Sequence, residues 1–112
     1  MHKDVYAFPS VFIYEDDGEI SIFFPDLNGC VSFGRNEQEA LHNAKEVLSL
    51  HLYGMEQDGD KIPTASSVES VELDDNEKVV LAEVYMPTFR AIQAKKFSEN
   101  VLTTPRGEGV LA

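Results

Sequence analysis

Carboxylates are the most abundant groups in this chain that could take part in chemistry. Residues 15–17 (Glu-Asp-Asp) and Glu19 surround one glycine, and side chains of this type can ligate a metal ion. Consecutive carboxylates in a tight turn point in different directions, however, and this spacing does not match a calcium-binding loop. Asp74 and Asp75 have the same limitation. We therefore interpret both groups as solvated turns and expect no metal site.

The single cysteine, Cys30, is a candidate nucleophile if a histidine and an acidic residue converge on it. Nothing in the spacing of His2, His42 and His51 places any of them near Cys30. His42 and His51 are nine residues apart rather than three or four, so they cannot share a metal site on one helix. We interpret Cys30 as a small buried hydrophobe and His51 as a packed residue on an apolar helix face. One cysteine also excludes an internal disulfide.

Asp26 and Glu83 could form a carboxylate pair for acid/base chemistry, because each is expected at the end or edge of a strand. Nothing in the sequence selects this pair over others. Gly29 and Gly34 are isolated and precede no Lys-Ser/Thr, so the chain has no phosphate-binding loop. The residues alone therefore favour binding over catalysis, and we expect no catalytic residue and no cofactor.

Charge is the second feature that limits function. The 112 residues include 20 acidic and 9 basic side chains, for a formal net charge of −11. Residues 1–87 have a net charge of −13 and residues 88–112 a net charge of +2. A body this acidic should repel phosphate backbones, which disfavours general nucleic-acid binding, and should attract basic partners or simply maintain solubility. No apolar stretch is long enough for a membrane span and the N-terminus has no signal-peptide core, so we expect a cytoplasmic protein.

The first third of the chain predicts three strands joined as an antiparallel meander. Residues 5–14 are rich in aromatic and β-branched side chains, with Pro9 suggesting an edge strand or an irregular entry. An Asp-Gly turn leads into a second strand at 19–24, where apolar and polar residues alternate. Residues 25–29 break the pattern, and a short third strand over 30–33 ends at Gly34.

A helix follows this meander. Asn36 can cap it, with Glu39 placed for the reciprocal capping bond. Its apolar stripe has helical spacing, and its end falls at Gly54 or Gly59. The stripe comprises Ala40, Leu41, Ala44, Val47, Leu48, His51, Leu52 and Met55.

The remaining chain predicts one more strand and a tail. Residues 60–67 form a loop in which Ser66 can cap one short helical turn through Val71, and residues 72–78 are acidic and expected to be flexible. Residues 79–85 are apolar enough for a strand inside a sheet. After Pro87 the periodicity weakens, and residues 103–109 indicate a loop or frayed tail. The fold class is therefore α+β, a two-layer sandwich with a domain over 1–87 and a tail over 88–112.

One family resembles this pattern. The matching residues are the run 24–30 (Phe-Pro-Asp-Leu-Asn-Gly-Cys), Gly34, the run 39–44 (Glu-Ala-Leu-His-Asn-Ala), the run 50–52 (Leu-His-Leu), Asp58-Gly59 and Ile62-Pro63. In this order they are similar to the HicB-like antitoxin domain, over about residues 5–86. Asn28 stands where the family has a second proline, and a second proline is also missing after Ile62-Pro63; neither change should alter the fold, because Asn also suits a turn.

The resemblance implies a partial ribonuclease-H-like fold and a partner rather than a substrate. Members of the family bind and neutralise HicA, a small basic toxin that cleaves messenger RNA. An acidic antitoxin would attract such a toxin and cover the surface that holds RNA. By carry-over, the exposed loop Pro25, Asp26 and Leu27 and the adjoining strand edge are the expected toxin-binding residues. The partners expected are therefore a HicA-type toxin and further copies of the chain, as a dimer or tetramer.

The C-terminus departs from the family pattern. Many members continue into a ribbon-helix-helix or helix-turn-helix segment that binds DNA, and Lys95-Lys96 followed by residues 100–105 resembles the opening strand of such a segment. Seven residues after Pro105 are too few for a stable helix pair, so we expect no DNA-binding residues and interpret the tail as a truncated remnant.

Two other interpretations stay open from the sequence. One is a residual ribonuclease-H-like nuclease that uses Asp26, Glu83 and a divalent metal. The other is an orphan oligomeric regulatory domain that kept the fold without its partner.

Overall fold

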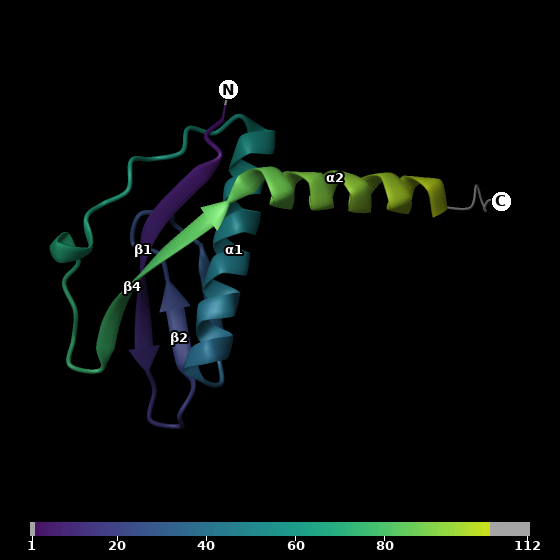
Figure 1. The fold of residues 1–112 in the computed structure, drawn as a ribbon. Coiled ribbons are helices and arrows are strands. Elements are labelled where there is room, and N and C mark those ends of the chain that lie inside the picture. The colour runs from purple at the N-terminus through teal and green to yellow at the C-terminus, as the bar shows by residue number, and fades with distance from the viewer. Residues whose placement is uncertain (1, 104–112) are drawn as a thin grey trace.

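A computed structural model describes the backbone of residues 2–103 and the side chains of residues 2–96. Its framework is a four-stranded sheet in the order β3-β2-β1-β4, with every neighbouring pair antiparallel (Figure 1). The strands are β1 (Val5–Tyr14), β2 (Ile20–Phe23), β3 (Val31–Gly34) and β4 (Glu77–Tyr85). The three helices are α1 (Glu37–Asp58), the short 3₁₀ turn η1 (Val68–Ser70) and α2 (Met86–Thr103). The expected α+β sandwich and its meander are confirmed.

Pro9 does not make β1 an edge strand, because β1 lies between β2 and β4. The proline is tolerated because β2 pairs only with Val11–Tyr14 of β1, whereas β4 pairs with the strand from Val5 onward. At Pro9 the strand therefore has a neighbour on one side only, where it lies opposite Leu81. β4 is the strand at the edge, so the expectation that it sits inside the sheet is wrong.

Helix α1 covers one face of the sheet and begins and ends at the expected signals. The side chain of Asn36 accepts a hydrogen bond from the Glu39 backbone N–H at 2.9 Å. Glu39 in turn accepts the backbone N–H of Arg35 at 2.7 Å, one residue before the position of the standard reciprocal bond. The helix ends at Gly59, in the left-handed conformation with φ 74°, and not at Gly54.

The core lies between α1 and the sheet. β1 contributes Tyr6, Phe8 and Phe12, while the segment after α1 adds Ile62 at its margin. The other buried apolar members of this cluster are Ile20, Ile22, Phe24, Leu27, Cys30, Ala40, Ala44, Leu48, Leu52, Ala82, Val84 and Met86. Leu41, which the sequence placed on the apolar stripe of α1, is instead exposed.

Two expectations for the loop after α1 need correction. Ser66 caps no helical turn, because its N–H and hydroxyl both donate to the carboxylate of Asp26. The short turn η1 follows Ser67, which makes no side-chain capping bond. Residues 72–76 lie in an exposed connection, and β4 begins at Glu77, two residues before the expected start.

The sequence missed helix α2. Pro87 suggested a break, yet proline is compatible with the first turn of a helix because the first N–H groups need no partner there. Residues 95–103 are helical, so the expected opening strand of a DNA-binding segment is wrong for these residues. Thr104, Pro105 and the rest of the expected tail lie outside the described residues. The boundary expected after residue 87 falls within the first turn of α2, whose residue Met86 is fully buried.

Candidate functional site

The β2–β3 loop, residues 24–30, contains the residues expected to bind a partner. Its shape is fixed from inside: Phe24, Leu27 and Cys30 are buried in the core. Three backbone hydrogen bonds of 3.0–3.2 Å join these same residues to one another. Gly29 adopts φ 83°, a left-handed conformation that glycine permits. The loop is thus rigid, and Pro25, Asn28 and Gly29 form its exposed tip.

Asp26 joins this loop to a segment 40 residues further along the chain. Its two carboxylate oxygens accept hydrogen bonds from the backbone N–H of Ser66 at 2.8 Å and from its hydroxyl at 2.6 Å. A carboxylate that accepts two such bonds is a strong fixed acceptor, so it holds the two loops together. The three residues expected to bind the toxin therefore differ in exposure: Pro25 is exposed, Asp26 is half-buried and Leu27 is buried.

A groove of about 610 Å³ runs between the loop and the C-terminal half of α1. We call it the acidic groove, because Asp26, Asp58 and Asp60 line it and Lys61 is the one Lys or Arg among its lining residues. Leu50 and Met55 of α1 contribute apolar wall. This combination suits a ligand that presents a positive charge next to an apolar group.

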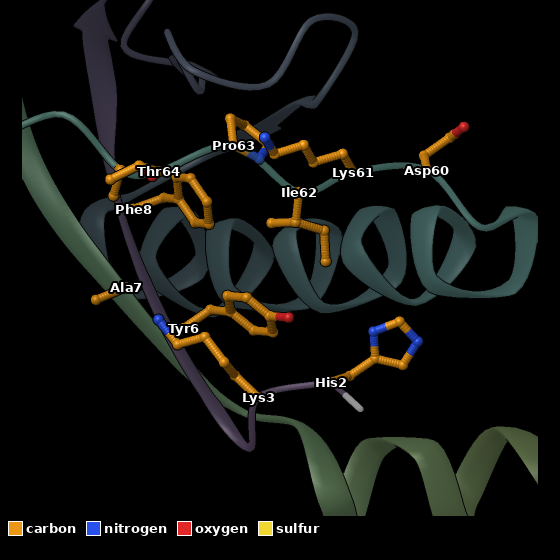
Figure 2. A pocket seen from close by; sticks show the side chains of 11 residues that line it. His2, Lys3, Tyr6, Ala7, Phe8, Asp60, Lys61, Ile62, Pro63 and Thr64 are labelled. Atoms are coloured by element: carbon orange, nitrogen blue, oxygen red, sulfur yellow. The ribbon is translucent and has the colours of Figure 1, made fainter.

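A second hollow, of about 420 Å³, lies between the start of β1 and residues 60–65. Figure 2 shows Tyr6 and Phe8 of β1 on one side of it and Ile62 on the other, with His2 and Lys3 at its margin. Ile62 packs against the core. The hollow thus offers a shaped surface between β1 and the segment that follows α1.

The structure separates the two carboxylates that could have formed an acid/base pair. Asp26 lines the acidic groove on the α1 side, where it is bonded to Ser66. Glu83 lies opposite Ala7 and is exposed, whereas its neighbours Ala82 and Val84 are buried under α1. Since side chains alternate along a strand, Glu83 points to the other side of the sheet. Among the described side chains, no three His, Cys, Asp or Glu residues lie close enough together to hold a metal ion.

Cys30 has the environment of a structural residue. Burial raises the pKa of its thiol to about 11. The thiol donates a hydrogen bond to the backbone carbonyl of Val47, at 3.8 Å. A thiol with this pKa is almost wholly protonated at neutral pH and is a poor nucleophile.

The ion pair that holds α2 against α1 has no local signal in the sequence. Glu56 is a buried acid on α1, with a side chain only 2% exposed, and Arg90 of α2 donates to both its oxygens at 3.0 and 2.8 Å. Arg90 also contacts Asp4 at 3.6 Å and the backbone carbonyl of Lys3. Tyr53 and Phe89 pack edge to face beside this pair. Beyond these contacts α2 projects away from the sheet (Figure 1).

Within residues 2–103 no helix combines the length and apolar composition needed to cross a membrane.

Comparison with known sequences finds relatives of this chain in a phage and in bacteria. An uncharacterized 14.9 kDa protein of Haemophilus phage HP1 is 39% identical over 54 residues, which cover 48% of this chain and 40% of that protein. A UPF0150 protein of Helicobacter pylori is 44% identical over 46 residues, which cover 41% of this chain and 64% of that protein. The matches therefore span less than two thirds of either relative's own length.

Comparison with solved structures shows the fold. A chain of a toxin-antitoxin complex from Streptococcus pneumoniae has a TM-score of 0.65 at 17% identity, covering 88% of this chain and 95% of that one. The antitoxin HicB of Burkholderia pseudomallei has a TM-score of 0.60 at 18% identity, with 85% and 86% covered. A chain of a HicA3 and HicB3 toxin-antitoxin complex has a TM-score of 0.54 at 23% identity, with 70% and 95% covered.

The family model described as HicB_like antitoxin of bacterial toxin-antitoxin system matches residues 8–104. This range includes all four strands except the start of β1, together with α1 and α2. The chain therefore belongs to the HicB-like antitoxin family of bacterial toxin-antitoxin systems.

Proposed function

We propose that this chain is an antitoxin that binds and neutralises a small, basic, HicA-type toxin that cleaves messenger RNA. The observation that carries the proposal is the family match over residues 8–104. Two of the structures with this fold are toxin-antitoxin complexes, which supports a toxin as the partner. Neutralisation needs no catalysis by this chain, because a tightly bound protein blocks an RNA-binding surface by covering it.

The charge of the chain supports a basic partner. The net charge of −13 over residues 1–87 favours approach of a cationic protein from any direction. The acidic groove concentrates three of these carboxylates beside the β2–β3 loop. Both features favour a partner that carries positive charge.

Pro25, Asp26 and Leu27 remain our proposed toxin-binding loop, with a different role for each residue. Pro25 is exposed and can contact the partner directly. Asp26 faces the acidic groove and holds the loop to Ser66. Leu27 is buried and acts by fixing the loop from inside.

The proposal predicts a short reading frame for a small basic protein beside this gene, and the direct test clones that frame. Induction of that protein alone should stop growth of a bacterial host, and co-expression of this chain should restore growth and yield a co-purified complex. Pro25→Lys should weaken the complex because it places a positive charge on the loop tip, whereas Gln38→Lys, an equal change at an exposed residue at the start of α1, should not. Failure of the wild-type chain to bind or to restore growth would contradict the proposal.

The nuclease alternative has no observation in its favour, since Asp26 and Glu83 lie on opposite sides of the sheet. Incubation of the chain with structured RNA and Mg²⁺ or Mn²⁺ tests it, and cleavage that Asp26→Asn abolishes would revive it.

Our proposal also includes the cytoplasm as the site of action and a homo-oligomer, a dimer or a tetramer. Among the described residues, α2 supports the oligomer, because Ala91, Ile92 and residues 94–96 are exposed on a helix that leaves the body of the molecule. Light scattering on the purified chain measures its mass in solution. An orphan domain without a toxin would form the oligomer yet bind no neighbouring protein.

A further inference from the structure

The sheet has a second face, which α1 does not cover. We call it the outer face, and it consists of every second residue of the four strands, on the side opposite the core. Its members are Val5, Ala7, Pro9, Val11 and Ile13 of β1, Ser21 and Phe23 of β2, Val31 and Phe33 of β3, and Glu77, Val79, Leu81, Glu83 and Tyr85 of β4.

The outer face is apolar, which is unusual for an antiparallel sheet with one covered side. Such a sheet commonly presents polar residues to water. Here Leu81 is 55% exposed, Phe33 56%, Val31 58% and Tyr85 59%. Val5 and Phe23 are also exposed, so this face holds six of the ten exposed large hydrophobic side chains among the described residues. A patch of this kind on a protein surface marks a protein-binding site.

The strand register places the exposed side chains in two groups. Phe23 of β2 lies opposite Val31 of β3 on one side and opposite Val11 of β1 on the other. Across β1, Leu81 of β4 lies opposite Pro9. Pro9 and Val11 are fully buried, and the connection that carries η1 from α1 to β4 lies on the side of the sheet away from α1 (Figure 1), so the middle of this face is covered. Phe23, Val31 and Phe33 therefore form one exposed group on β2 and β3, and Leu81 and Tyr85 form another on β4.

The charges on this face are all acidic. Glu77 and Glu83 are its two charged strand residues, and Glu15 joins them because its carboxylate accepts a hydrogen bond from Ser21 at 2.7 Å. The one cation within the described strands, Lys78, points to the α1 side, where its ammonium group lies over the Tyr14 ring and 4.0 Å from Glu37. A partner for the outer face must therefore bring an apolar surface edged with positive charge.

We propose that the toxin docks on the outer face at β4, with its apolar residues against Leu81 and Tyr85 and a basic side chain paired with Glu83. This inference rests on the proposed antitoxin function and specifies the surface that performs it. A second copy of the chain fits less well, because it would place Glu77 and Glu83 against the same carboxylates and a like-charge contact is costly. The outer face also continues into the β2–β3 loop, which leaves the sheet directly after Phe23 and re-enters it at Val31.

The test compares substitutions on the outer face with equal substitutions on the α1 side. Leu81→Asp and Glu83→Lys alter the patch, while Leu41→Asp and Glu46→Lys make the same changes at exposed positions of α1. Each variant is titrated with the basic protein encoded beside this gene, and circular dichroism verifies that each is folded. We expect the outer-face variants to lose about tenfold or more in affinity and the α1 variants to stay close to wild type.

The outcomes separate this inference from the function on which it rests. Wild-type binding with no loss in Leu81→Asp or Glu83→Lys would overturn docking on the outer face and leave the antitoxin function intact. No binding by the wild-type chain would overturn both. A wild-type dimer that Leu81→Asp converts to a monomer, with toxin affinity unchanged, would show that a second copy covers this face.

Discussion

Arg90 is the residue on which the position of α2 depends. Its guanidinium joins Glu56 of α1, Asp4 and the backbone carbonyl of Lys3, so one side chain connects three parts of the chain. The hydrogen bonds that Arg90 donates to Glu56 raise the pKa of the guanidinium above its usual value, so it stays charged. Removing Arg90 would leave the buried carboxylate of Glu56 without its partner, which is costly in a site shielded from water.

We therefore predict that Arg90→Ala lowers the free energy of unfolding by about 3 kcal/mol. Urea denaturation monitored by circular dichroism measures this loss. Arg35→Ala is the matched control, because Arg35 makes a similar ion pair with Glu39 while its own side chain is 75% exposed. Exposed ion pairs contribute little, so this variant should unfold near the wild-type midpoint. Equal losses in the two variants would contradict the role assigned to the buried pair.

The raised pKa of the Cys30 thiol leads to a prediction about the stability of the fold at alkaline pH. Its thiol pKa is raised from 9.0 to about 11 by burial, so the folded protein retains the thiol proton at pH values where the unfolded chain has lost it. The buried, protonated thiol therefore contributes its full stabilisation of the folded state below pH 9. This contribution is lost as the pH rises from 9 through 11, where the unfolded chain ionises first. The gap in unfolding free energy between wild type and Cys30→Ala should thus be constant from pH 7 to 9 and shrink by about 2 kcal/mol by pH 11.

Urea titrations of both proteins at each pH, with a reductant present, measure this gap. The groups that titrate in both, Tyr14 among them, cancel in the difference. A gap that stays constant up to pH 11 would show that the folded thiol ionises as easily as the unfolded one.

At the scale of elements, the backbones of β3 and α1 approach each other closely at Gly34. A Cβ atom on Gly34 would lie 2.5 Å from the backbone nitrogen of Ala40 and 2.6 Å from its Cα. Both are backbone atoms in the first turns of α1, held by the Asn36 cap, so they cannot move aside as a flexible side chain would. Gly34 is therefore required by close approach and not by its dihedral angles.

We predict that Gly34→Ala destabilises the fold by about 2 kcal/mol or more, because β3 and α1 must separate to admit the methyl group. Gly54→Ala serves as the opposite control: this glycine lies within α1, with no atom within 4 Å of its added Cβ. Alanine there should stabilise by about 0.5–1 kcal/mol through better helix propensity. Thermal unfolding of the two variants measures both effects, and a neutral Gly34→Ala would contradict the close contact.

The elements that could be predicted from the sequence are those with local signals. Alternating apolar residues and the Asp-Gly turn indicated the meander, and Asn36 and Gly59 marked the ends of α1. Helix α2 lacked such a signal, because its anchor is Arg90 bonded to Glu56, 34 residues away. The sequence identified the β2–β3 loop, but the Asp26–Ser66 connection joins residues 40 apart and could not be predicted from spacing.

The outer face shows how an apolar strand can be misinterpreted. Residues 79–85 predicted a strand inside the sheet, since apolar residues occur at nearly every position. β4 is instead an edge strand with Leu81 and Tyr85 exposed. In our proposal, the toxin covers these two side chains.

At the scale of the whole molecule, charge should control how fast the complex forms. The net charge of −11 produces a long-range field that steers a basic protein toward this chain, and dissolved salt screens that field. The apolar contacts of the outer face act only after the proteins touch, and salt affects them much less. The association rate constant should therefore fall by roughly tenfold between about 50 and 500 mM NaCl, while the dissociation rate constant changes little.

Stopped-flow mixing of this chain with the basic protein encoded beside its gene measures both constants. Glu83→Lys and Glu46→Lys provide the comparison, because they change the net charge of the chain equally and should weaken steering to a similar, small degree. Only Glu83→Lys removes a charge that our docking arrangement places in contact with the toxin, so it alone should also speed dissociation. An association rate that is independent of salt would mean that the acidity of this chain serves solubility and not recognition.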